Sequence, residues 1–237
     1  SRAPRTVSFS ATSLSLSSVG TPKTLPTSVT GETFLTSLER MLELRHISVS
    51  DMDNNCYLLC ENGQGLLIDA ASHAPDLLAM ADEAGVKITA VLTTHRHYDH
   101  TRALAEVLEA TGAKHYAPFL DAPAIPAPAD VELHDGDTIE FAGHSFPVCI
   151  LRGHTPGGAC LVAEIDGTTN LFVGDSLFPG GLGKTQSEGD FVRLFNDVKE
   201  KVFDVYPDDS IVWPGHGKPT TLGNERPNLD DWWDRRW

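Results

Sequence analysis

The chain has 237 residues, of which 41% are hydrophobic, and its formal net charge at pH 7 is −15. This length and composition suffice for a domain with a well-buried core, and no apolar run approaches the roughly 18 residues of a membrane-spanning helix. Because the excess charge is acidic, the composition argues against nucleic acid as a partner, and the sequence predicts neither a nucleic-acid nor a membrane partner.

Residues 1–31 are rich in serine and threonine, hold Arg2, Arg5 and Lys23 but no acidic residue, and lack hydrophobic periodicity. They suit a disordered tail, a segment left by cloning or an organellar targeting peptide, and we place a single domain at residues 32–237. The four cysteines show neither C-x-x-C spacing nor disulfide-rich density, which predicts a reducing, cytoplasmic location. Within them, Cys56 and Cys60 are expected to be small core residues on one side of a strand.

From about residue 46 the pattern alternates between strand-like and helix-like runs. Helical periodicity predicts helices at Ala74–Glu83, Thr101–Ala110 and Asp190–Phe203. Alternating or continuous apolar runs between turn-forming residues predict strands at Asn55–Glu61, Gly65–Asp69, Ile88–Thr93, Thr138–Phe141, Phe146–Leu151, Ala159–Glu164, Leu171–Val173 and Ile211–Trp213. The pattern favours an α/β fold with two packed sheets flanked by helices. Four prolines make Pro118–Ala129 an irregular loop that could overhang a site.

Seven residues of metal-ligand type follow one another in a fixed order. Four lie within T-H-R-H-Y-D-H, and each of the others lies in its own glycine-rich turn: His95, His97, Asp99, His100, His154, Asp175 and His216. The first four would share one tight turn, between a strand ending at Thr93-Thr94 and a helix beginning near Asp99. Imidazole and carboxylate groups suit zinc, and also iron or manganese. The set therefore predicts two divalent metal ions, with Asp175 as the bridging carboxylate.

Five other histidines lack this context, and we interpret them as ordinary surface or core residues: His46, His73, His115, His134 and His144. Asp69 closes an apolar strand, where a carboxylate either forms a turn or orients a liganding histidine. Three tryptophans near the C-terminus, Trp232, Trp233 and Trp237, are expected to pack on the same domain, and the sequence is compatible with a monomer or a homodimer.

The motif H-x-H-x-D-H followed by a lone His, a Gly-Asp and a Gly-His resembles the metallo-β-lactamase superfamily. The segments M-D-N-N-C-Y-L-L (52–59), L-L-I-D-A (66–70), G-D-S-L-F (174–178) and P-G-H-G (214–217) are similar to its glyoxalase II branch. The resemblance implies a four-layer αββα sandwich. It also implies one metal at His95, His97 and His154, a second at Asp99, His100 and His216, and Asp175 between them, with Asp69 orienting a ligand.

In glyoxalase II a lysine after the Gly-Asp segment contacts glutathione, and Lys184 resembles it; an exposed lysine without a ligand is the equal alternative. The tyrosine expected two residues later is Gln186, and the chain stops 21 residues after His216, without a further helical domain. The resemblance therefore points to short glyoxalase II-like hydrolases.

These features predict a metal-dependent hydrolase that acts on a small-molecule thioester by attack of a metal-bridging hydroxide, with Asp99 and Asp175 as catalytic residues. Within the same superfamily, an iron-dependent persulfide dioxygenase and a lactonase or other ester hydrolase stay open as alternatives. Lactonases of this fold show a tyrosine three residues after the bridging aspartate, where this chain has Phe178.

Overall fold

Two mixed sheets of six strands each form the frame of residues 42–236, the part of the chain that the computed structural model describes. In the first sheet, neighbouring strands follow the chain order: β1 (Glu43–Val49), β2 (Asn54–Glu61), β3 (Gln64–Ile68), β4 (Lys87–Leu92), β5 (Lys114–Pro118) and β6 (Val131–Leu133). Pairing is antiparallel from β1 to β3 and parallel from β3 to β6. The predicted tail at residues 1–31 and the predicted boundary at residue 32 lie outside the described residues.

The second sheet runs in the order β14 (Thr220–Thr221), β13 (Ile211–Pro214), β10 (Thr168–Gly174), β9 (Gly158–Ile165), β8 (His144–Leu151) and β7 (Thr138–Phe141). Only β10 and β13 pair in parallel. A separate short hairpin joins β11 (Leu177–Phe178) to β12 (Gly181–Leu182).

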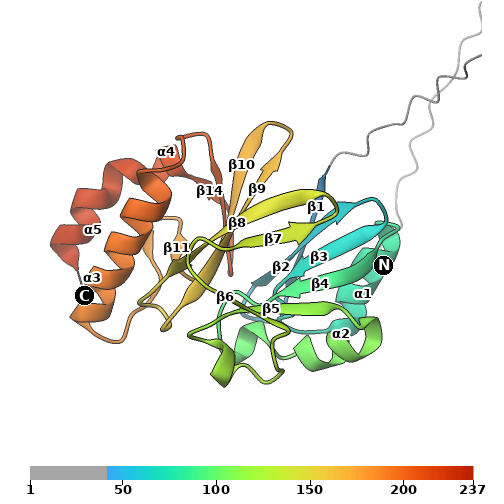
Figure 1. Cartoon of the computed structure of the whole chain (residues 1–237). Coiled ribbons are helices and arrows are strands. Elements are labelled where there is room, and N and C mark those ends of the chain that lie inside the picture. Colours follow the sequence, from blue (N-terminus) through green and yellow to red (C-terminus); the bar gives the residue numbers. More distant parts are fainter. Residues whose placement is uncertain (1–41, 237) are drawn as a thin grey trace, which may run out of the picture. The chain divides into compact units, whose positions relative to one another are not determined.

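Helices cover the outer face of each sheet (Figure 1). On the first sheet lie α1 (Ala74–Glu83) and α2 (Leu104–Thr111), and on the second lie α3 (Glu188–Val198), α4 (Leu222–Glu225) and α5 (Leu229–Arg235). Shorter helical turns are the 3₁₀ segments Tyr98–His100, Ala122–Ala124 and Arg226–Asn228 and a π-helical turn, Lys199–Phe203, which continues α3. Within residues 42–236, no helix has both the length and the apolar character needed to cross a membrane.

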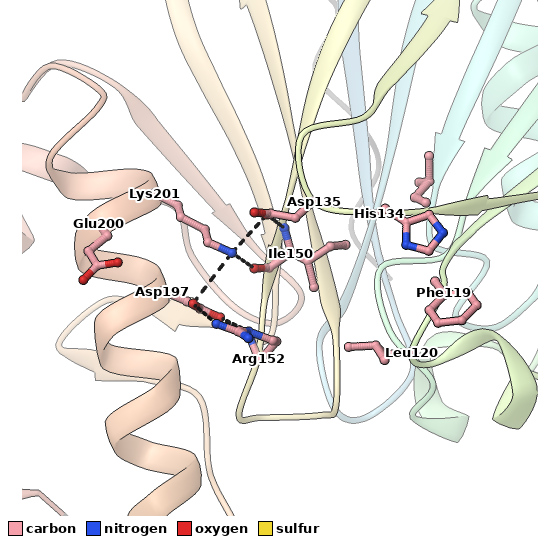
Figure 2. A pocket seen from close by; sticks show the side chains of 10 residues that line it. Phe119, Leu120, His134, Asp135, Ile150, Arg152, Asp197, Glu200 and Lys201 are labelled. Atoms are coloured by element: carbon pink, nitrogen blue, oxygen red, sulfur yellow. Dashed lines mark hydrogen bonds and ion pairs between the residues drawn. The ribbon is translucent and has the colours of Figure 1, made fainter.

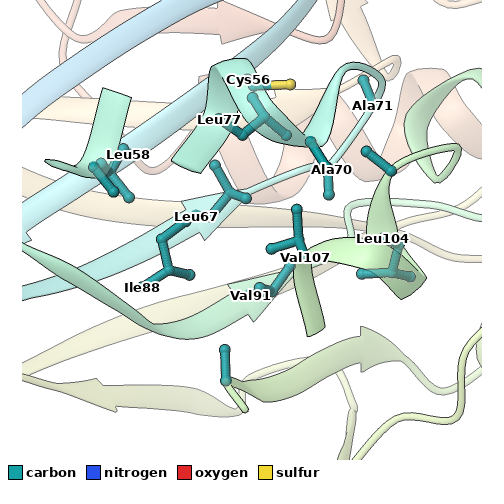
Figure 3. Close-up of a cluster of buried hydrophobic side chains, with 14 of the residues drawn as sticks. Cys56, Leu58, Leu67, Ala70, Ala71, Leu77, Ile88, Val91, Leu104 and Val107 are labelled. Carbon is teal, nitrogen blue, oxygen red and sulfur yellow. The ribbon is translucent and has the colours of Figure 1, made fainter. Parts of the chain in front are cut away.

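Successive side chains of a strand point to opposite faces of its sheet, and both faces of the central strands are buried. Their sequences are therefore almost continuous apolar runs. In β2, Cys56, Leu58 and Cys60 face the first helical layer, whereas Tyr57 and Leu59 face the other sheet. Figure 3 shows the cluster under α1 and α2, in which Cys56, Leu67 and Leu77 meet. A strand that is buried on both faces needs apolar side chains at successive positions. The predicted αββα sandwich is therefore confirmed, as is the core position of Cys56 and Cys60.

The second sheet shows the same division of its two faces. In β10, Phe172 points toward the first sheet, while Leu171 and Val173 pack under the C-terminal helices. Trp232 is buried in that outer cluster and Trp233 packs against Phe195, as expected for packing on the same domain. Trp237 lies outside the described residues.

The predicted helix at Ala74–Glu83 is confirmed with the same bounds, and the Pro118–Ala129 loop holds only one 3₁₀ turn. The expectation that a helix begins near Asp99 is wrong. A 3₁₀ turn occupies Tyr98–His100, and α2 begins only at Leu104, because Thr101 has a non-helical φ of −131° and the Ala103 amide donates to the Ala70 carbonyl. The third predicted helix begins two residues earlier than expected, since the Ser187 side chain accepts a hydrogen bond from the Asp190 amide and caps α3.

Candidate metal centre

The turn after β4 is built on Asp69, which is buried at the end of the neighbouring strand β3. Asp69 has a positive φ of 60°, and its carboxylate accepts hydrogen bonds from the Thr94 amide at 2.7 Å and the Thr94 hydroxyl at 2.8 Å. The left-handed backbone, which aspartate tolerates better than most residues, turns the carboxylate under the T-H-R-H-Y-D-H segment. His95 and His100 are thereby held buried, while Tyr98 points outward and is 74% exposed.

Four donor groups come together on one side of the site: His95, His97, His154 and Asp175, whose ligand atoms lie within 4.8 Å of one another. His154 Nε2 lies 3.0 Å from His97 Nδ1 and 3.6 Å from Asp175 Oδ2. His95 and His97 follow β4 of the first sheet, whereas His154 and Asp175 follow β8 and β10 of the second, so the group joins strand ends of both sheets.

A second group lies beside the first and consists of Asp99, His100 and His216. His216 Nε2 is 3.1 Å from His100 Nε2 and 3.2 Å from Asp99 Oδ2. His216 follows β13, which pairs in parallel with β10, so the two adjacent strand ends deliver His216 and Asp175 to one place.

The Asp175 carboxylate lies between the two groups. Its Oδ2 is 3.9 Å from His95 Nε2 and 3.6 Å from His154 Nε2 in the first group, and 3.4 Å from His216 Nε2 in the second. Its Oδ1 is 3.4 Å from His100 Nε2. A carboxylate in this position can donate one oxygen to each of two metal ions.

Two glycines make this approach possible. A Cβ atom on Gly215 would lie 2.1 Å from Asp175 Oδ1 and 2.6 Å from His100 Cε1, and one on Gly183 would lie 1.7 Å from the Asp175 carbonyl oxygen. Because real Cβ atoms never approach so closely, only glycine fits at either position. Gly215 is therefore required by the geometry of the site and not only by the turn.

The hydrogen bonds around the histidines aim their free nitrogens into the centre. Nδ1 of three of them faces an oxygen: His100 faces Asp69 Oδ2 at 2.8 Å, His154 the Lys184 carbonyl at 2.7 Å, and His216 the Met52 carbonyl at 2.8 Å. A carbonyl or carboxylate oxygen can only accept, so we assign the hydrogen to Nδ1, which leaves the Nε2 lone pair of each neutral ring inside the site.

This donor set fits a metal. His95 Nε2 and Asp175 Oδ1 are buried and have no hydrogen-bond partner among residues 42–236, although buried polar atoms are almost always paired. The Nε2 atoms of His100 and His216 face each other at 3.1 Å, an arrangement that repels when both rings are neutral and that a proton or a metal ion between them relieves. Imidazole nitrogens with carboxylate oxygens are typical ligands of zinc, and also of iron or manganese.

The electrostatics of the buried groups agree with cation binding. Burial lowers the pKa of His95 well below its ordinary value, and His100 lowers it further, so His95 is neutral as a ligand must be. Burial raises the pKa of the Asp175 carboxyl, but its interactions with His100 and His216 outweigh burial and hold the pKa well below its usual range. Burial lowers the pKa of His100, but Asp69 and Asp175 outweigh it and raise the pKa to about 10, so the carboxylates favour a positive charge here and a bound metal ion would displace the proton of this ring.

All seven predicted ligands are thus brought together, and the contact required for Asp69 to orient His100 is present; the assignment as metal ligands stays a prediction. Lys184 contributes its backbone carbonyl to His154, while its side chain is exposed and lines a neighbouring cavity with Leu182 and Phe191. None of the five histidines interpreted as structural belongs to either group.

Sequence reasoning missed two asparagines at the start of β2. Asn54 is fully buried and donates from Nδ2 to Asp99 Oδ2 at 2.9 Å. Asn55 Nδ2 donates to the carbonyls of Pro214 and Gly217, each at 2.9 Å, and so fixes the turn that carries His216. Consecutive asparagines at the head of an apolar strand are the signal that could have identified them, because buried amides need partners.

Comparison with known proteins agrees with this geometry. The sequence model of a family described as the Metallo-beta-lactamase superfamily matches residues 49–216. A hydroxyacylglutathione hydrolase of Polaromonas sp. (strain JS666 / ATCC BAA-500) is 37% identical over 164 residues, which cover 68% of this chain but only 61% of that protein. The hydroxyacylglutathione hydrolase GloC of Haemophilus influenzae is 28% identical over 206 residues, covering 78% of this chain and 95% of that one. Among solved structures, TTHA1623 in a di-iron-bound form is 29% identical with a TM-score of 0.65, covering 77% of this chain and 96% of that chain.

Proposed function

Because the chain belongs to the metallo-beta-lactamase superfamily, we propose that it is a metal-dependent hydrolase of small-molecule thioesters, with a hydroxyacyl thiol of the glyoxalase II type as substrate. One observation carries the proposal: the Asp175 carboxylate lies within 3.4–3.9 Å of nitrogens from both donor groups. The similarity to GloC over 95% of its length supports the short glyoxalase II-like type, and the Polaromonas relative supports the substrate class.

We propose that His95, His97 and His154 hold one divalent ion, that Asp99, His100 and His216 hold a second, and that Asp175 contacts both. Zinc is the first choice, with iron or manganese as alternatives. When bound, such ions supply Lewis acidity for a carbonyl oxygen and lower the pKa of a coordinated water to about 7.

The chain's own residues position the reactants. Asn54 holds Asp99 Oδ2, and the Asp99 side chain is 21% exposed, so this carboxylate reaches the open side of the centre. There Asp99 can orient the attacking water and accept its proton. Burial raises the pKa of Asp99, but the Asn54 hydrogen bond and His100 outweigh burial and lower it, so the group is ionised at neutral pH. Water and thioester give a carboxylic acid and a thiol, with no oxidant required.

The test is the loss of S-lactoylglutathione in the presence of zinc-loaded protein, compared with Asp175→Asn, which keeps the side-chain shape but removes the shared negative charge. We expect turnover in the parent and at least a 100-fold loss in the variant, within the range known for groups that act on a developing charge.

The alternatives are measured with the same preparation. Iron-loaded protein is supplied with glutathione persulfide while oxygen uptake is recorded, and zinc-loaded protein is supplied with a lactone. Oxygen uptake or lactone hydrolysis without thioester hydrolysis would overturn the thioesterase proposal in favour of the corresponding superfamily activity.

A further inference from the structure

A cavity of about 420 Å³ opens beside the metal centre and has His154 in its wall. Three arginines line it, Arg96, Arg152 and Arg193, with Asp190 as the one acidic residue among its lining. Asp197, which pairs with Arg152 from outside the lining, and Asp190 together offset two of the three guanidinium groups, so among the described residues the wall keeps one unpaired positive charge, on Arg96, in a chain whose net charge is −15. A local excess of positive charge next to a reaction centre favours an anionic ligand.

The three arginines differ in whether their charge is already paired with a carboxylate. Arg152 makes a bidentate pair with Asp197, with Nε 2.8 Å from Oδ2 and a terminal nitrogen 2.7 Å from Oδ1 (Figure 2). Arg193 contacts Asp190 at 3.1 Å. Arg96 is exposed, and within the described range its guanidinium makes neither a hydrogen bond nor an ion pair. Arg96 is therefore the cation available to a ligand.

The backbone of Arg96 is nevertheless fixed. Asp121, which is fully buried, accepts from the Arg96 amide with one oxygen and from the Gly157 amide with the other, each at 3.0 Å. This carboxylate ties the T-H-R-H-Y-D-H turn to the turn that carries His154. The Arg96 side chain therefore extends from a fixed backbone, and its neighbours in the sequence are the predicted ligands His95 and His97.

Thr155 adds a polar side chain to the same wall. Thr155, which is 4% exposed, lines the cavity, and its hydroxyl has no hydrogen-bond partner among residues 42–236. A buried hydroxyl without a partner is costly unless something completes its bonding. The hydroxyl oxygen is enclosed, so it could donate to an anionic oxygen near Arg96 only after the Thr155 side chain turns toward the cavity.

A second cavity of about 430 Å³ shares the lining residues Leu120 and Arg152 with the first. Figure 2 shows Phe119 and Leu120 facing Ile150 and Arg152 across this second cavity. Phe119 is 45% exposed and Leu120 47% exposed, so the second cavity offers apolar surface beside the charged wall. A hydroxyacyl group of a few atoms would leave most of the 420 Å³ cavity empty, so the space beside His154 has room for part of the thiol half as well.

We propose that the cavity between Arg96 and His154 binds an anionic group on the thiol half of the substrate, and that Arg96 is a specificity-determining residue. The proposal rests on the proposed thioesterase function. The ligand chemistry is a negatively charged oxygen group, either a carboxylate, as in glutathione, or a phosphate, as in coenzyme A. Arginine suits both because its planar fork matches their paired oxygens.

The experiment compares three lactoyl thioesters that differ only in the thiol: glutathione, coenzyme A and the uncharged N-acetylcysteamine. Each is tested with zinc-loaded parent, Arg96→Gln and the control Arg102→Gln. Arg102 is also exposed, but it lies near the Met52 sulfur on the His216 side and does not line the cavity.

We expect Arg96→Gln to raise KM about 10-fold for a charged thioester, the loss typical of one charge-assisted hydrogen bond, with kcat and the N-acetylcysteamine reaction unchanged. The charged substrate with the larger rise in KM identifies the anion as carboxylate or phosphate. Equal effects on charged and uncharged thioesters, no effect on either, or the same effect from Arg102→Gln would overturn the proposal.

Binding without turnover separates this inference from the proposed function. S-methylglutathione and desulfo-coenzyme A cannot be hydrolysed at a thioester, and their affinity for zinc-loaded protein is measured by calorimetry. If the parent hydrolyses no thioester, the thioesterase proposal fails, yet weaker binding of either probe by Arg96→Gln still supports the anion site. Binding of neither probe to the parent, or equal binding to both proteins, would refute it.

Discussion

Replacing Asp69 by asparagine tests how the protein holds the second donor group. Asp69 accepts three hydrogen bonds, two from Thr94 and one from His100 Nδ1, all between 2.7 and 2.8 Å. Asparagine tolerates the positive φ of this position, so the backbone should survive the change. Its amide, however, offers only one acceptor oxygen where the carboxylate offers two.

Either orientation of the new amide is unfavourable. With its oxygen toward the Thr94 amide, the NH₂ group faces His100 Nδ1, and His100 must move its hydrogen to Nε2, the nitrogen that faces Asp99 and His216. With its oxygen toward His100, the NH₂ group opposes the buried Thr94 amide, at a cost of about 1–3 kcal/mol. Loss of a residue that orients a metal ligand typically lowers metal affinity 10–100-fold, which corresponds to about 1.4–2.8 kcal/mol.

The assay is a zinc titration in competition with a chromophoric chelator, together with metal content by mass spectrometry after dialysis. We expect two zinc ions per parent chain and, in Asp69→Asn, one site weakened by the stated factor. Asp197→Asn is the matched control, because Asp197 is also a buried carboxylate but contacts none of the seven ligands. Two sites of unchanged affinity in folded Asp69→Asn would refute the orienting role of Asp69.

Three further predictions follow from individual contacts. Gly215→Ala should lower kcat/KM at least 100-fold, since its Cβ would displace Asp175 and His100. The control Gly189→Ala, whose Cβ would meet only Ser187 at 3.8 Å, should keep full activity. An active Gly215→Ala protein would contradict the claim that only glycine fits at this position. Burial raises the pKa of Asp197, but its hydrogen bonds with Arg152 outweigh burial and lower the pKa. The parent should therefore be more stable than Asp197→Asn by about 2 kcal/mol, a value that is discounted because the arginine is half-exposed. This difference should be constant above about pH 5 and shrink as the pH falls below about 4. Urea unfolding across this range checks it, and a difference that grows on acidification would contradict it. Removing metal with a chelator should lower Tm by several degrees and zinc should restore it, as expected when only the folded state binds metal; an unchanged Tm would contradict a preformed site.

The sequence predicted those parts of the fold that carry their own local signal. The strand at Asn54–Glu61, predicted at Asn55–Glu61, is a continuous apolar run, and the helix at Ala74–Glu83 has helical periodicity; both have clear turn residues at their ends. The strands β1, β5, β6, β11, β12 and β14 were missed. β1 is exposed or half-buried at all but its last residue, and the others have only two to five residues, so their pairing depends on neighbouring strands.

The candidate site also has parts that the sequence predicted and parts that it did not. The seven ligand-type residues were predictable because histidine and aspartate at such spacing rarely serve packing. The contacts of Asn54 and Asp121 join residues 45 and 36 positions apart, and the role of Arg96 depends on a cavity formed with the turn after β8. The sequence indicates only Lys184 as a cation for an anionic substrate, since no local pattern places Arg96 and Arg193 beside His154.

The most direct measurement is the rate of S-lactoylglutathione hydrolysis as zinc is added stepwise to metal-free protein, for the parent and for Asp175→Asn. If Asp175 joins two metal ions in one hydrolytic centre, the parent's rate should reach its plateau at two zinc ions per chain, and Asp175→Asn should stay at least 100-fold below that plateau. A plateau at one zinc ion, or equal rates in the two proteins, would contradict the two-metal centre.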